Sequence, residues 1–179
     1  RDWSSDVCSS DLERVKPGYR LSLADDRVDM LEFGALAKQV RAATEEQRWD
    51  AARELSETAL RLWRGPLLQD AGDQDWVAVE ASALTETRRA VAEAHITALL
   101  AAADTGAALA EIAALRGEDP LRERGVWLHM LALYRAGRGA EALSVFTEHS
   151  ETLDTELGLD PGTELRELQG SILRHDPEI

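Results

Sequence analysis

The fold is decided by the stretch Leu131-Ala132-Leu133-Tyr134-Arg135-Ala136-Gly137-Arg138-Gly139-Ala140-Glu141-Ala142-Leu143. It predicts a helix that ends after Tyr134, a tight corner flanked by Gly137 and Gly139, and a second helix in which Ala142 lets the two backbones approach closely. Units of this kind are typical of tetratricopeptide arrays, in which each helical hairpin buries its apolar side only against its neighbours. Such an array offers a surface to partners, so the pattern favours recognition over catalysis.

The helical pattern continues on both sides of this corner. Apolar residues recur at intervals of three and four from Asp29 to the end of the chain. We therefore expect an all-α fold, a tetratricopeptide-like stack of about seven helices that form three hairpins of irregular length and a terminal cap. The expected helices cover about 29–43, 49–63, 75–106, a shorter stretch that ends at 117, 121–136, a helix through 142–153, and one with Asp160 as its N-cap and Pro161 as its first residue.

The same periodicity predicts which side of each helix is buried. In the third helix the expected apolar stripe is Trp76, Val79, Ala83, Ala90 and Ala94. In the last two helices the expected stripes are Ala142, Val145, Phe146, His149 and Leu153, and then Leu165, Leu168 and Ile172.

The N-terminal residues differ from the rest. Residues 13–24 predict a Pro17-Gly18 turn and a short alternating strand, the remnant edge of a sheet, because an isolated strand is not stable. Residues 2–12 resemble a translated sequencing adapter, so we expect residues 1–12 to be a disordered artefact in which Cys8 has no role; the alternative is a natural serine-rich linker.

Composition excludes several classes of function. The formal net charge is −14 and the isoelectric point about 4.7, which argues against direct contact with nucleic acid or an anionic membrane. We find no apolar run long enough to span a membrane, no secretory leader and a single cysteine, and we expect a cytoplasmic protein. Arginine outnumbers lysine strongly, which indicates a bacterial source with a GC-rich genome.

No motif predicts catalysis. The four histidines (His95, His129, His149 and His175) are scattered and lack partners at metal-ligand spacing. Gly137-Arg138-Gly139 is a corner and not a phosphate-binding loop, since no strand precedes it. We expect no catalytic residue, metal or cofactor.

Two groups of side chains are candidates for contact with a partner. The first is the arginine group Arg122, Arg124, Arg135 and Arg138, placed at both ends of the fifth helix of an otherwise acidic chain. The alternative is that these arginines complement helix dipoles and pair locally, Arg122 with Glu118 or Asp119. The second group is made of tryptophans, which could anchor a peptide but more simply pack in the core: Trp49, Trp63, Trp76 and Trp127.

Several stretches, taken together and in order, resemble one known family. They are Pro17-Gly18-Tyr19-Arg20-Leu21; Val28-Asp29 with Phe33; Leu60-Arg61-Leu62-Trp63-Arg64-Gly65-Pro66; Asp119-Pro120-Leu121-Arg122-Glu123; Ala132-Leu133-Tyr134-Arg135-Ala136-Gly137-Arg138; and Glu156-Leu157-Gly158-Leu159-Asp160-Pro161-Gly162 with Leu165. Residues 17–179 are similar to the bacterial transcriptional activator domain of SARP-type regulators.

The resemblance implies a domain organisation and a function. Residues 25–179 would be the helical activation domain, and residues 13–24 the last strand of a winged-helix DNA-binding domain that is otherwise missing. The helical domain would act by contact with RNA polymerase or a sigma factor and by self-association as a possible homodimer. Promoter DNA would be bound only through the winged-helix domain. The alternative that we keep open is a generic tetratricopeptide-like adaptor that binds peptides and is unrelated to transcription.

Overall fold

The computed structural model describes residues 12–21, 28–65, 75–177 and 179. Within these residues lie the seven helices that were expected and two short strands, where one strand was expected. The elements are β1 (Leu12–Val15), β2 (Gly18–Leu21), α1 (Asp29–Glu45), α2 (Trp49–Arg61), α3 (Asp75–Ala101), α4 (Thr105–Glu118), α5 (Glu123–Arg135), α6 (Gly139–Leu157) and α7 (Thr163–Leu173).

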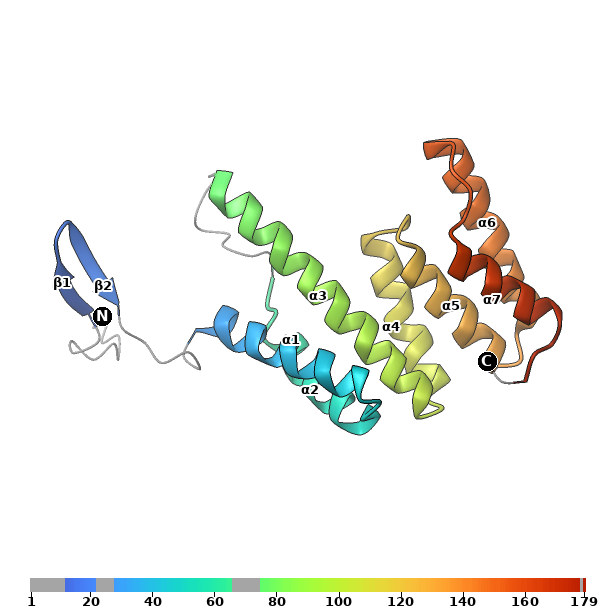
Figure 1. The fold of residues 1–179 in the computed structure, drawn as a ribbon, viewed down its shortest axis with the longest axis horizontal. Helices are drawn as coiled ribbons and strands as arrows, with labels where there is room; N and C mark the ends of the chain where they lie inside the picture. The colour runs from blue at the N-terminus through green and yellow to red at the C-terminus, as the bar shows by residue number, and fades with distance from the viewer. Residues whose placement is uncertain (1–11, 22–27, 66–74, 178) are drawn as a thin grey trace, which may run out of the picture.

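The helices form a single stack of antiparallel hairpins (Figure 1). α1 packs on α2, α3 on α4, and α5 on α6, while α7 closes the end of the stack against α5 and α6. α3 also packs on α1 and α2, so it joins the first hairpin to the rest. The tetratricopeptide-like, all-α prediction is confirmed.

The same corner closes each hairpin. Gln47, Ala103 and Gly137 lie between the paired helices, and each has a left-handed backbone with φ of 54°, 59° and 75°. In each corner the next residue donates its backbone N–H to a carbonyl five positions earlier, as in the Schellman motif: Arg48 to Ala43, Asp104 to Leu99 and Arg138 to Leu133. The last two corner residues are 34 positions apart, which is the tetratricopeptide period.

The buried stripes of the last two helices match the prediction. The buried residues of α6 are Ala142, Val145, Phe146, His149 and Leu153. Those of α7 are Leu165, Leu168 and Ile172. These helices each present one side to the stack, so a simple helical period describes them well.

The predicted stripe of α3 is wrong at three of its positions, whereas its member Ala94 is partly buried and packs against the core. Val79 is 68% exposed, and Ala83 and Ala90 are also exposed, whereas Val91 and Ile96 are buried. The side chain of Trp76 lies outside the described residues. The physical reason is that α3 packs against α1 and α2 and also against α4 and α5, so its buried side changes along its length.

Two predicted helix ends are also wrong. α3 ends at Ala101, because Asp104 caps α4 by accepting the backbone N–H of Ala107 (3.1 Å). Gly106, the expected breaker, therefore lies in the first turn of α4. α7 begins at Thr163 with Gly162 as its N-cap, each two residues later than expected.

The N-terminal segment is a hairpin and not a lone strand. β1 pairs antiparallel with β2, and Leu12 lies opposite Leu21. The predicted Pro17-Gly18 turn lies at the junction, and Figure 1 shows the hairpin apart from the helical stack. The expected artefact, residues 1–12, lies outside the described residues except for Leu12. None of the described helices is long and apolar enough to cross a membrane.

Candidate interaction groove

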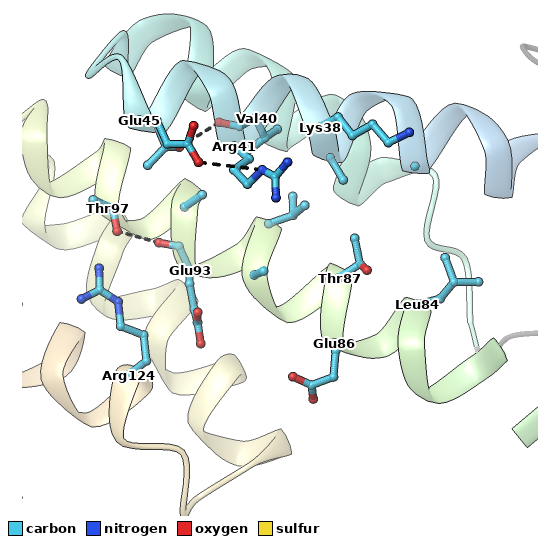
Figure 2. A pocket seen from close by; sticks show the side chains of 16 residues that line it. Lys38, Val40, Arg41, Glu45, Leu84, Glu86, Thr87, Glu93, Thr97 and Arg124 are labelled. Atoms are coloured by element: carbon cyan, nitrogen blue, oxygen red, sulfur yellow. Dashed lines mark hydrogen bonds and ion pairs between the residues drawn. The ribbon is translucent and has the colours of Figure 1, made fainter. Parts of the chain in front are cut away.

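The first helices of the three hairpins line an open groove. α1 and α3 supply most of its lining, and Arg124 at the start of α5 closes one end (Figure 2). Its volume is about 760 Å³, within the usual range for ligand-binding clefts. We call this feature the interaction groove.

The floor of the interaction groove is mainly apolar and lined by small residues. Leu84 and Ala90 from α3 face it, above the buried Val40 and Val91. Its threonines add little polarity, because each hydroxyl donates to a carbonyl of its own helix. These bonds run from Thr44 to Val40, Thr87 to Ala83 and Thr97 to Glu93.

Two carboxylates that line the groove, Glu86 and Glu93 on α3, form ion pairs with arginines. Arg122 donates to Glu93 (2.5 Å) and to Glu86 (2.8 Å), and Arg89 also pairs with Glu86 (2.5 Å). Hydrogen bonds from Arg89 and Arg122 hold the pKa of Glu86 below its ordinary value, so this carboxylate stays ionised.

The predicted arginine group does not form one surface. Arg122 and Arg124 lie at the start of α5, beside the groove, whereas Arg135 is the last residue of α5 and Arg138 precedes α6. Arg135 donates to the carbonyl of Leu100 (3.0 Å). Arg138 binds both carboxylate oxygens of Glu141 (2.7 and 2.6 Å).

Arg122 pairs with α3 and not with the local acids expected as its partners. Those acids belong to other arginines of α3: Arg88 pairs with Glu118, and Arg89 pairs with Asp119 (3.4 Å). The network therefore ties α3 to the loop between α4 and α5.

Arg124 is the arginine of this group that faces the groove with its charge unpaired. Its guanidinium lies over the ring of Trp127, 4.5 Å from the ring centre, and it makes no ion pair with any described residue. A stacked guanidinium is held in place and remains available to an incoming carboxylate.

The described tryptophans pack within the stack. Trp63 makes an edge-to-face contact with Phe33 (5.6 Å between centroids), and the guanidinium of Arg88 lies over its ring. Trp49 packs against the small core residues of α1, α2 and α3, and Trp127 against the main core. The core interpretation of these three residues is therefore supported over that of peptide anchors.

Three of the four histidines are buried or partly buried within the helical stack. The Nδ1 of His95 is 2.9 Å from the Oγ of Ser56, and both side chains are buried between α2 and α3. His129 accepts a hydrogen bond from Arg116 (2.9 Å), and burial lowers the pKa of both His129 and His149. No group of three or more His, Cys, Asp or Glu side chains among the described residues is arranged to hold a metal ion.

Some residues of the stretches that carry the family resemblance make contacts between helices. Arg122 joins α5 to α3, and Glu123 accepts the backbone N–H of Gly162 (2.7 Å) at the start of α7. The hydroxyl of Tyr134 donates to the carbonyl of Asp176 (2.9 Å). These residues therefore connect helices of the stack, and none of them lines the interaction groove.

Sequence reasoning missed the groove residues of α1 and α3. Lys38, Arg41 and Glu45 follow one side of α1, at the spacing of adjacent helical turns. That spacing was visible in the sequence, but it does not show that α3 and α5 lie opposite.

Comparison with known proteins agrees with this architecture. Residues 28–173 match the family model described as "Bacterial transcriptional activator domain". The chain is 39% identical over 168 residues to the transcriptional regulatory protein EmbR of Mycobacterium tuberculosis, covering 93% of this chain and 43% of that protein. It is 36% identical over 163 residues to the regulatory protein DnrI of Streptomyces peucetius, covering 90% of this chain and 60% of that protein.

A solved structure shows the same fold. The structure of Mycobacterium tuberculosis EmbR in complex with a low affinity phosphopeptide superimposes with a TM-score of 0.86 at 36% identity, covering 94% of this chain and 44% of that one. The chain thus spans about half the length of the relatives that it matches. The family match, the relatives and the shared fold together show that this chain belongs to the bacterial transcriptional activator domain family of SARP-type regulators.

Proposed function

We propose that this chain is the interaction domain of a bacterial DNA-binding transcriptional regulator and acts by contact with RNA polymerase or its sigma factor. Family membership over residues 28–173 supports a role in transcription. The observation that carries the mode of action is the interaction groove, an open apolar cleft along α1, α3 and α5. A partner protein can bind such a surface without any chemical reaction taking place.

In this proposal the helical domain makes no contact with promoter DNA. Its net charge of −14 opposes binding to a phosphate backbone. Promoter binding would be the task of a winged-helix domain of the parent protein, which we place in the cytoplasm. Self-association as a homodimer would align two such domains on repeated DNA sites. Family membership argues against an adaptor unrelated to transcription.

A fusion experiment tests the proposal. The full chain is joined to an unrelated DNA-binding protein whose operator lies upstream of a weak bacterial promoter. We expect transcription to rise and purified RNA polymerase holoenzyme to be retained by the chain. If the fusion protein occupies the operator but neither activates transcription nor retains polymerase, the proposal is contradicted. A gel shift with the chain alone should show no specific promoter binding.

A further inference from the structure

The interaction groove carries cations that the chain itself leaves unpaired. Lys38 on α1 and Arg124 on α5 line it, and neither makes an ion pair with a described residue. Arg41, between them along the wall, is 3.8 Å from Glu45, and both side chains are more than two-thirds exposed. An exposed pair of this length contributes little, so Arg41 is also available to a partner.

Two of the three carboxylates of the groove, in contrast, already have close partners, whereas Glu45 has only the long, exposed pair with Arg41. Glu86 is bound by Arg89 and Arg122, and Glu93 by Arg122. Figure 2 shows Lys38 and Arg41 along α1, Arg124 at the α5 end, and Glu86 and Glu93 on α3. Lys38, Arg41 and Arg124 therefore outnumber the one carboxylate that is left available, Glu45, and the free charge of the groove is positive.

The acidic character of the whole chain does not cancel this local charge. At physiological ionic strength, interactions between exposed charges fade beyond about 8 Å. A ligand in the groove is governed by the side chains that line it, and by the apolar floor under them.

We propose that the interaction groove binds an acidic segment of a partner protein. Its carboxylates would meet Lys38, Arg41 and Arg124, and its apolar side chains would cover the floor at Leu84 and Ala90. This inference deepens the proposed function and rests on its premise that the domain acts by contact with other proteins. It adds the surface and the chemistry of the segment that binds there.

Nucleic acid fits this groove less well than an acidic peptide. A phosphate backbone carries one charge per nucleotide and needs a continuous basic track. Here Glu45, Glu86 and Glu93 lie among the three cations. A peptide with spaced carboxylates and intervening apolar residues matches both the scattered charges and the floor.

Peptide binding to the full chain tests the inference. The probe is a short fluorescein-labelled peptide in which glutamates alternate with leucines and alanines; in the control peptide lysines replace the glutamates. We expect the glutamate peptide to bind, with an affinity that falls as salt is added, and the lysine peptide to bind far more weakly. Equal binding of the two peptides, or tighter binding at high salt, would overturn the proposal.

Charge reversal locates the site. The double variant Lys38→Glu/Arg124→Glu should bind the glutamate peptide about tenfold more weakly. The matched control is Lys16→Glu/Arg166→Glu, which makes the same charge change at exposed positions outside the groove and should bind like the wild type. If both double variants lose the same affinity, binding reflects net charge and the groove is not the site.

A steric variant tests the floor independently of charge. Ala90 lines the groove and is exposed, so Ala90→Trp fills the groove without disturbing the core. We expect it to block the glutamate peptide while the thermal melt stays like that of the wild type. A folded Ala90→Trp variant that binds normally would overturn the proposal.

Sedimentation tests the rival occupant, a second acidic copy of this chain. A wild-type dimer that Lys38→Glu/Arg124→Glu converts to a monomer would assign the groove to self-association and overturn the proposal. The fusion and peptide experiments together distinguish failure of the proposed function from failure of this inference. Peptide binding without activation by the fusion protein contradicts only the proposed function, and activation without peptide binding contradicts only this inference.

Discussion

Glu123 at the start of α5 accepts a hydrogen bond from the backbone N–H of Gly162, 39 residues later in the chain (2.7 Å). Gly162 is the N-cap of α7 and has no side chain with which to cap it. A Cβ at this position would come within 2.4 Å of the Glu123 carboxylate. A side chain at position 162 would therefore displace the Glu123 carboxylate from this hydrogen bond, which joins the terminal helix to the last hairpin.

Removal of this acceptor should loosen α7. We expect Glu123→Ala to lower the free energy of unfolding by about 1.5–2 kcal/mol, because a partly buried bond to a charged group is lost. Glu123→Gln keeps an acceptor oxygen, so its free energy of unfolding should lie between those of the wild type and Glu123→Ala. Urea denaturation measures the effect, and Glu167→Ala, an exposed change on α7, is the control. A Glu123→Ala variant as stable as wild type would show that the bond contributes nothing.

Substitution of Arg122 should weaken the attachment of α5 to α3. Arg122 bridges two carboxylates with its side chain 29% exposed, so we expect Arg122→Met to cost about 1–2 kcal/mol, between the values for exposed and buried pairs. Arg138→Met breaks an exposed pair with Glu141 and should lower the melting temperature less than Arg122→Met does. Thermal melts compare the two variants. Equal losses would mean that the bridge to α3 adds no stability.

The repeated corner predicts opposite effects for reciprocal substitutions. Ala103 and Gly137 occupy equivalent left-handed positions, with φ of 59° and 75°. A left-handed alanine costs about 1–2 kcal/mol, partly offset by the greater freedom of glycine in the unfolded chain. We expect Ala103→Gly to stabilise the protein and Gly137→Ala to destabilise it, each by roughly 0.5–1 kcal/mol. Chemical denaturation gives both signs, and a stabilising Gly137→Ala would refute the equivalence of the corners.

Stability should fall as the pH drops below 6.5. Burial lowers the pKa of His149, with Arg116 lowering it further and Glu123 opposing; burial also lowers the pKa of His129. The unfolded chain then binds more protons than the folded one between the folded pKa and the ordinary value of 6.5. The free energy of unfolding therefore rises with pH across this window and is lowest below the folded pKa.

His149→Leu should reduce this pH dependence. Nε2 of His149 is buried and has no hydrogen-bond partner among the described residues. An apolar side chain there removes both the proton uptake and the unsatisfied nitrogen, so the variant should hold its stability better at acid pH. Urea midpoints between pH 5 and 8 make the comparison, with the exposed Thr147→Ala on the same helix as control. A slope identical to that of the wild type would contradict the role assigned to His149.

The sequence predicted the parts of the fold that depend on neighbours along the chain. The corner at Gly137 and the buried stripes of α6 and α7 are confirmed because each depends on residues within a few helical turns. The α3 stripe failed at Val79 because four other helices pack on α3 from different sides. The partner of Arg122 failed for a related reason, since Glu93 lies 29 residues away and is brought near only by packing.

By itself, the amino-acid order determined an acidic all-α chain with a glycine-bearing corner at Gly137, and the family to which it belongs. The helical period and a corner marked by glycine are local properties, so they can be inferred without knowledge of what packs where. The equivalent left-handed corners at Gln47 and Ala103 carry no such mark and were found only in the structure. Tertiary structure alone decided that Lys38 of α1 and Arg124 of α5 line one groove while two of its carboxylates are paired with arginines. That arrangement depends on the angle and spacing at which successive hairpins stack, which is set by the sum of many side-chain contacts between distant segments.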